Sequence, residues 1–143
     1  MKILLLKLIT SVLLLATSLV VLAGDREDAD KAAKSILSSL QSKSYETLWN
    51  SQMSEFFRSK VTKDSFLANL TLGRQQLGTL SESKFIDMAY SQVDPGSGMK
   101  GEIYAFNYLN TYTAGKFYER IVVVKEKDGK FRLAGLWGTP AAK

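Results

Sequence analysis

The side chains that could do chemistry in this sequence are carboxylates, tyrosines and basic groups, because the chain contains no histidine and no cysteine. It therefore cannot build a Ser-His-Asp or Cys-His nucleophile system, or a zinc site based on cysteine or histidine. The sequence also lacks a phosphate-binding glycine loop and a nucleophile elbow. What remains is acid–base chemistry by carboxylates and tyrosines, or binding without catalysis. We expect no cofactor and no metal.

Arg74 is the first candidate binding residue, because helical spacing places it on or beside an apolar stripe within residues 67–77. A charge in such a position needs a partner. In the interpretation that we favour, Arg74 pairs with a carboxylate such as Glu46, Glu55 or Asp87, or with backbone carbonyls. In the alternative, its planar guanidinium binds an anion in a cavity.

An aromatic face forms the second candidate. Strand alternation places Tyr104, Phe106, Tyr108 and Tyr112 on one face, with Asn110 among them. Such a face either belongs to the core, which we favour because aromatic pairs stabilise sheets without a ligand, or lines an apolar pocket with hydroxyl groups. Tyr104 and Tyr108 are the binding candidates within it.

Asp87 is the candidate acid or base. Counting alternate residues along its predicted strand places it on the same face as Phe85 and Ala89. A carboxylate beside tyrosines in a helix-covered cavity would resemble the Asp and Tyr pairing of ketosteroid isomerase. The simpler expectation is a solvated or salt-bridged side chain.

Basic residues gather in the last predicted hairpin, a pattern that usually marks a solvated sheet edge. Contact with anionic lipid or polymer is the alternative, and predicted export argues against nucleic acid. The residues are Lys116, Arg120, Lys125, Lys127, Lys130 and Arg132.

Three helices precede four strands in the predicted order of elements. Apolar spacing predicts helices over 27–42, over 44–57 with a break near Met53 or Ser54, and over 62–77, where Thr62 is the N-cap and Gly78 the stop. Strand patterns then cover 80–93, 102–112, 116–126 and 131–138, joined by short turns. We therefore predict an α+β fold, with three N-terminal helices packed on a four-stranded antiparallel meander.

Residues 1–23 are predicted to be a cleavable signal peptide. The segment has two lysines, no acidic residue and an uncharged run from Leu8 onward that is short for a membrane span. Val21-Leu22-Ala23 fits the small-x-small cleavage pattern. Cleavage near Ala23 would leave residues 24–143 as one α+β domain, periplasmic or secreted. No cysteine comes next for lipid attachment, so membrane contact is expected only through the signal peptide before cleavage.

Residues 29–137 resemble the bacterial exported proteins grouped as domain of unknown function 4019. The resemblance is carried by Tyr45, Trp49, Phe57-Arg58, Val61, Arg74-Gln75-Gln76-Leu77-Gly78 and Phe131-Arg132-Leu133. It implies an envelope location and a compact helix-plus-sheet fold, and it brings no established reaction or ligand. The order of elements also resembles the nuclear-transport-factor-like cone, in which helices close one side of a curved sheet.

The prediction for function is a non-enzymatic exported module that binds an envelope protein or a small ligand. The first alternative is a small enzyme with a carboxylate and tyrosines in a cone-shaped cavity. The second is an envelope structural or stress protein without a small ligand, which would expose an apolar patch instead of a cavity.

Overall fold

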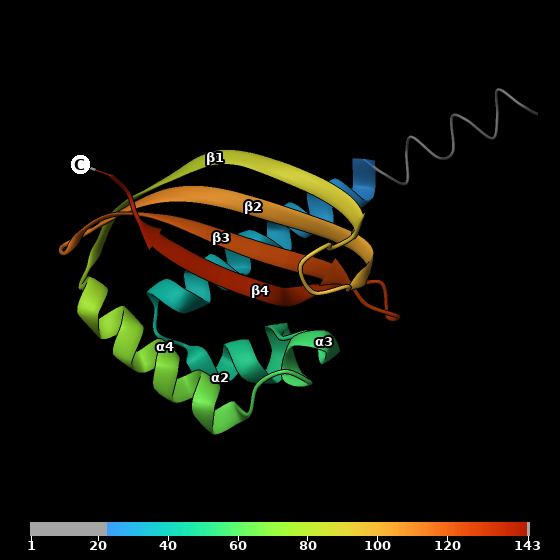
Figure 1. The fold of residues 1–143 in the computed structure, drawn as a ribbon, viewed down its shortest axis with the longest axis horizontal. Helices are drawn as coiled ribbons and strands as arrows, with labels where there is room; N and C mark the ends of the chain where they lie inside the picture. The colour runs from blue at the N-terminus through green and yellow to red at the C-terminus, as the bar shows by residue number, and fades with distance from the viewer. Residues whose placement is uncertain (1–22, 143) are drawn as a thin grey trace, which may run out of the picture.

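The structure, a computed structural model, describes residues 23–142 (Figure 1). The predicted signal peptide lies outside the described residues except for Ala23. None of the helices between residues 23 and 142 has the length and apolar character needed to cross a membrane.

The described part of the N-terminal helix covers residues 23–41 and begins earlier than predicted. Its apolar stripe faces the core, with Ala29, Ala33, Ile36 and Leu40 almost fully buried. Figure 1 shows this helix passing behind the sheet, while the other helices gather below. The core therefore lies between the N-terminal helix and one face of the sheet, which we call the inner face.

The second predicted helix is divided into three pieces: α2 (Tyr45–Thr47), the π-helical turn η1 (Leu48–Gln52) and α3 (Glu55–Arg58). The break falls at the predicted place, because Met53 is extended and forms a parallel bridge with Leu133. Ser54 donates its backbone N–H to the carbonyl of Leu133 at 2.9 Å. The segment thus attaches to the last strand, and its helical hydrogen bonds are interrupted there.

Helix α4 (Lys63–Leu77) has the predicted boundaries. The side chain of Thr62 accepts a hydrogen bond from the Ser65 backbone N–H at 3.3 Å, which makes it the N-cap. Phe66 is buried in the main core cluster and Val61 packs against the same cluster. Gly78 ends the helix with a φ of 76°, a conformation that favours glycine.

The four strands form one antiparallel sheet in the order β1-β2-β3-β4, as the meander prediction requires. Their bounds are β1 (Leu80–Val93), β2 (Lys100–Tyr112), β3 (Gly115–Lys125) and β4 (Phe131–Pro140). The α+β class is therefore confirmed. Strand β1 is an edge with three irregularities in its pairing to β2, one of them between Phe85 and Asp87.

The two faces of the sheet differ in what covers them. The inner face buries Tyr104, Phe106, Ile121 and Val123 against the helices. The outer face carries a smaller cluster that includes Ile103 and packs partly against α3. Beyond this cluster the outer face is exposed, as Tyr118 on β3 and Trp137 on β4 show.

Candidate functional site

Arg74 is almost buried and pairs with a carboxylate that was not among its predicted partners. Its Nη2 lies 2.6 Å from Oε1 of Glu119 on β3, and only 10% and 5% of the two side chains are exposed. The prediction that Arg74 needs a partner is confirmed, but the partner is none of Glu46, Glu55 and Asp87. Alternation along β3 places Glu119 with the buried Ile121, a signal that could have identified it.

The Arg74–Glu119 pair belongs to a buried hydrogen-bonding cluster, in which only the Asn110 Oδ1 lacks a partner among the described residues. Arg74 Nη1 lies 2.6 Å from the Tyr112 hydroxyl, which donates to Oε2 of Glu119. Asn110 donates its side-chain amide to the same carboxylate oxygen. Burial, and then the hydrogen bond to Glu119, raise the pKa of Tyr112 above its usual value. The cluster joins α4 to β2 and β3 and leaves no free acid or base.

Tyr104 and Tyr108 lie on the inner face as alternation predicted, and both are buried. Their hydroxyl oxygens make no hydrogen bond to the described residues. Burial raises the pKa of Tyr108 to about 12. Tyr108 also lines a groove of about 490 Å³ between the N-terminal helix and β1, together with Phe85 and Met88. The aromatic face is thus mainly core, with one end at a groove.

Asp87 lies on the outer face, away from the other three candidates. The irregularity between Phe85 and Asp87 adds one residue to β1, so that Phe85 pairs with Tyr108 while Asp87 pairs with Asn107. Such a bulge shifts the alternation by one residue. The prediction that Asp87 shares a face with Phe85 is therefore wrong, and Asp87 instead accepts a hydrogen bond from the Asn107 amide. Arg74, Asp87 and the tyrosines do not meet around one cavity.

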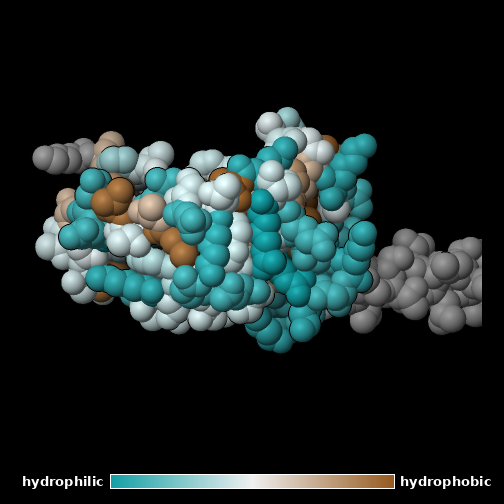
Figure 2. Space-filling model, turned by 90° about the horizontal axis from the view of Figure 1, so that it is seen from below, coloured by the Kyte–Doolittle hydropathy of each residue, from teal (hydrophilic) through white to brown (hydrophobic). Residues whose placement is uncertain are grey.

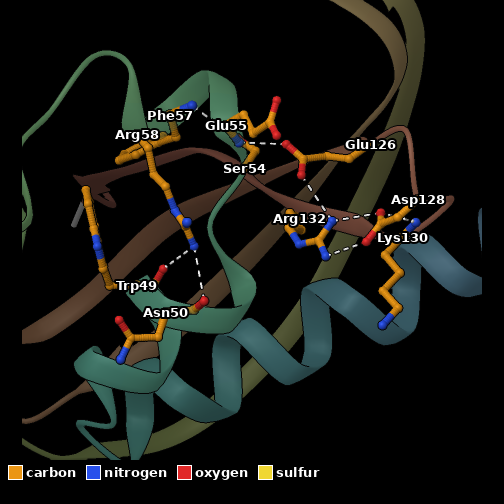
Figure 3. Close-up of polar contacts among 10 residues, drawn as sticks. All are labelled: Trp49, Asn50, Ser54, Glu55, Phe57, Arg58, Glu126, Asp128, Lys130 and Arg132. Carbon is orange, nitrogen blue, oxygen red and sulfur yellow. Dashed lines mark hydrogen bonds and ion pairs between the residues drawn. The ribbon is translucent and has the colours of Figure 1, made fainter.

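A cleft of about 1010 Å³ lies elsewhere in the molecule, and none of the four candidates lines it. Its walls are η1 and α3 on one side and the β3–β4 turn on the other, with the β1–β2 loop at one end. Figure 3 shows the polar side chains that connect the two walls. In Figure 1, α3 and the β3–β4 turn lie toward the right. Figure 2 views the molecule from below, and the right-hand part of the described surface is covered mainly by hydrophilic side chains.

Arg132 organises the turn side of the cleft. Its guanidinium binds both oxygens of Asp128, at 2.9 and 2.6 Å, and lies 3.0 Å from Oε2 of Glu126. The hydrogen bond from Arg132, and then that from the Lys130 backbone N–H, lower the pKa of Asp128 well below its usual range. The fork geometry holds the turn in one conformation.

Glu126 ties the turn to the opposite wall. Its Oε1 accepts the Glu55 backbone N–H at 2.6 Å, at the start of α3, where a carboxylate complements the helix dipole. Ser54 is fully buried beneath this contact and accepts the Phe57 N–H at 3.1 Å as the N-cap of α3. The cleft thus has connected, hydrogen-bonded walls before any ligand binds.

Three lysine side chains of the cleft have no ion-pair partner within the described part of the chain. Lys100, Lys127 and Lys130 line the cleft and form no ion pair with any residue between 23 and 142. Lys125, in contrast, lies 2.7 Å from Asp25, a contact that raises its pKa. The basic hairpin of the sequence is therefore split into paired side chains and free lysines.

Two backbone carbonyls of η1 are also taken. Arg58 donates to the carbonyls of Trp49 and Asn50 at 2.6 and 3.2 Å. Glu126 and Asp128, the carboxylates that could attract a cation, are already held by Arg132. Across residues 23–142 there is no group of three or more Asp and Glu side chains placed to hold a metal ion. The arrangement is suited to binding a negatively charged group.

Sequence reasoning identified the basic residues of the hairpin but missed the cleft. Its second wall comes from η1 and α3, about 70 residues earlier in the chain, as the contact between Glu55 and Glu126 shows. The available signal was the predicted break near Met53 and Ser54, because a chain that leaves a helix must satisfy its backbone elsewhere.

Comparisons with known proteins agree with this fold and assign no activity. The model of the family described as protein of unknown function (DUF4019) matches residues 32–136, which include the whole cleft. No curated protein matches the sequence. A solved structure from Catenulispora acidiphila is similar, with a TM-score of 0.55 and 15% sequence identity, over 82% of this chain and 91% of that chain. At this identity the likeness supports the fold alone.

Proposed function

This chain belongs to the DUF4019 family of proteins of unknown function, and for this member we propose a non-enzymatic role as an exported envelope protein that binds anionic groups in the cleft. The observation that carries the proposal is a set of lysines without ion-pair partners among residues 23–142, namely Lys100, Lys127 and Lys130, around walls whose turn carboxylates are already paired. The export component rests on the signal-peptide pattern of residues 1–23.

The charge of the cleft supports an anionic ligand. Six basic side chains line it against three acidic ones, and Arg132 offsets one of the two negative charges of Glu126 and Asp128. Glu55 is the one lining carboxylate without an ion pair among the described residues. A cleft with a surplus of one sign concentrates ligands of the other sign. Because the cleft is open to solvent, it suits phosphate or carboxylate groups on a larger or flexible molecule.

The alternative of a small enzyme would need a carboxylate and tyrosines around an accessible space. Glu119 and Tyr112 are such a pair, but both are buried and bound to Arg74. We therefore prefer binding to catalysis.

The test uses residues 24–143 and two polyanions, linear polyphosphate and polyglutamate, titrated by calorimetry at two salt concentrations. We expect binding that weakens with salt, and about fivefold or greater loss of affinity in Lys127→Gln/Lys130→Gln, which removes two rim charges near a shared ligand. The matched control is Lys84→Gln/Lys116→Gln, which removes the same charge toward the far end of the sheet. Equal loss in both double variants, or no binding at low salt, would contradict the proposal.

A further inference from the structure

A row of polar and aromatic side chains crosses the outer face of the sheet in register. Asp87 on β1 pairs with Asn107 on β2, Asn107 pairs with Arg120 on β3, and Arg120 pairs with Trp137 on β4. With strands about 4.8 Å apart, the row is about 14 Å long. It borders a groove of about 430 Å³ that is separate from the cleft of the proposed function.

The aromatic end of the row is exposed. Trp137, Tyr118 and Ile86 are 55%, 50% and 42% exposed, and all three line the groove. Single exposed apolar side chains are common on protein surfaces, whereas several gathered around one groove are typical of a contact surface. Three such side chains in one groove therefore indicate a surface that a ligand contacts.

The Trp137 ring is positioned by a glycine. A β-carbon at Gly135 would lie 2.2 Å from Cη2 and 2.3 Å from Cζ3 of Trp137, so the ring occupies the space that any other residue would fill. Gly135 does not have a positive φ, and the glycine is therefore required by the ring and not by the backbone. The ring is held over the strand before a ligand arrives.

The polar part of the row retains unused hydrogen-bonding capacity. Asn107 donates to Oδ1 of Asp87 and accepts from Arg120 Nη1 at 3.4 Å. This chain orients the three side chains, and it leaves Oδ2 of Asp87 and most Arg120 N–H groups without a partner among residues 23–142. Donors and acceptors therefore alternate along the floor of the groove beside an aromatic ring.

From this geometry we infer that the outer face binds a carbohydrate, with a pyranose ring stacked on Trp137 and hydroxyls bonded to Asp87, Asn107 and Arg120. A sugar ring has an apolar C–H face that packs on an aromatic ring, and hydroxyls that both donate and accept. The length of the row matches a di- or trisaccharide. An apolar partner surface would leave Asp87 and Arg120 desolvated without hydrogen bonds, which is costly.

The experiment measures binding of neutral hexamers of glucose and of N-acetylglucosamine to residues 24–143. The Trp49→Phe background leaves Trp137 as the sole tryptophan, so its fluorescence reports the site, and calorimetry gives the affinity. We expect saturable binding of at least one hexamer. Trp137→Ala should weaken it about tenfold or more, since a stacked ring contributes about 1 kcal/mol beyond its buried area.

Two further variants separate recognition from folding. Gly135→Ala keeps the tryptophan but displaces its ring, and should weaken sugar binding severalfold while the circular dichroism spectrum is unchanged. Gly73→Ala is its control, because a β-carbon there meets nothing within 4 Å. Arg120→Met should weaken binding without altering the Trp137 emission of the free protein.

Three results would overturn the inference. The first is no binding of any hexamer at millimolar concentration. The second is binding that Trp137→Ala leaves unchanged. The third is concentration-dependent self-association that Trp137→Ala abolishes in a protein that binds no hexamer, because the face would then be a contact between copies of the chain. Binding by Lys127→Gln/Lys130→Gln at wild-type affinity would support two independent sites.

Discussion

Two arginine–carboxylate clusters lie within residues 23–142, and they differ in their exposure and in what surrounds them. Arg74 and Glu119 are buried, and Tyr112 and Asn110 both donate hydrogen bonds to the Glu119 carboxylate. Arg132 and Asp128 lie at the mouth of the cleft, and the Asp128 side chain is 46% exposed. The first cluster excludes ligands, whereas the second is surrounded by lysines without ion-pair partners among the described residues.

The comparison indicates where function is to be sought. An isolated arginine in an apolar stripe attracts attention in a sequence, but burial forces it to be neutralised. Charges that stay in water have no such requirement, because solvation stabilises them without a partner. Free lysines beside a rigid, internally paired turn are therefore a better indication of binding than a buried arginine.

The largest expected effect comes from breaking the buried cluster. Arg74→Met leaves the Glu119 carboxylate without its cation, and the free energy of unfolding should fall by about 3 to 5 kcal/mol. Urea denaturation measures the change, and polyphosphate affinity should stay the same. Lys63→Met is the control: it opens the exposed Lys63–Glu46 pair and should cost less than about 1 kcal/mol. Lost polyphosphate affinity in a stable Arg74→Met protein would support a binding role for Arg74 instead.

The next largest effect concerns the exposed cluster of Arg132, Glu126 and Asp128, which we call the open cluster. Arg132→Gln releases Glu126 and Asp128, and should reduce the free energy of unfolding by about 1 to 2 kcal/mol. It should also weaken polyphosphate binding, because two unpaired carboxylates then face the ligand. Calorimetry and urea denaturation report the two quantities separately. Arg26→Gln makes the same charge change in the N-terminal helix, and an equal effect on affinity there would contradict the comparison.

The third effect tests the buried region at high pH. The folded pKa of Tyr108 is raised to about 12, so folding favours its neutral form. Its contribution to stability is complete below the unfolded pKa of about 10 and is lost as the pH rises toward 12. Tyr108→Phe should reduce the alkaline loss of stability and change stability at pH 7 by less than about 1 kcal/mol, since the hydroxyl has no hydrogen-bond partner within the described part of the chain. Thermal unfolding from pH 7 to 12 provides the measurement, and parallel curves would refute the prediction.

The smallest effect tests the open cluster at low pH. Arg132 and the Lys130 N–H lower the folded pKa of Asp128, so its contribution to stability is present above the unfolded pKa of about 4 and declines as the pH falls below it. Asp128→Asn should unfold at a slightly lower temperature than wild type at pH 7. The difference should shrink in acid. If the difference in unfolding temperature between the variant and wild type is constant from pH 7 to pH 2, the charge of the Asp128 carboxylate does not contribute to stability.

Much of the fold could be predicted from local patterns. Thr62 and Gly78 bounded α4, and Met53 marked the break in the second helical segment, because caps, stops and interruptions are local events. The order of strands was also predictable, since short turns join neighbours in a meander. The bulge before Asp87 was invisible, because one extra residue leaves no compositional trace yet moves the later residues of the strand to opposite faces.

The predictions for the candidate site can be divided in the same way, into features that the sequence determined and features that it could not. By itself the sequence determined that nucleophile systems and zinc sites built on histidine or cysteine are excluded, that Arg74 requires a partner and that Tyr104 and Tyr108 face inward, since residue types and strand alternation are properties of the chain. Only the tertiary structure decided that Glu119 is the partner of Arg74, that α3 meets the β3–β4 turn to form the cleft, and that Trp137 lies over Gly135. Pairings between segments depend on register and packing, which no short stretch of sequence contains.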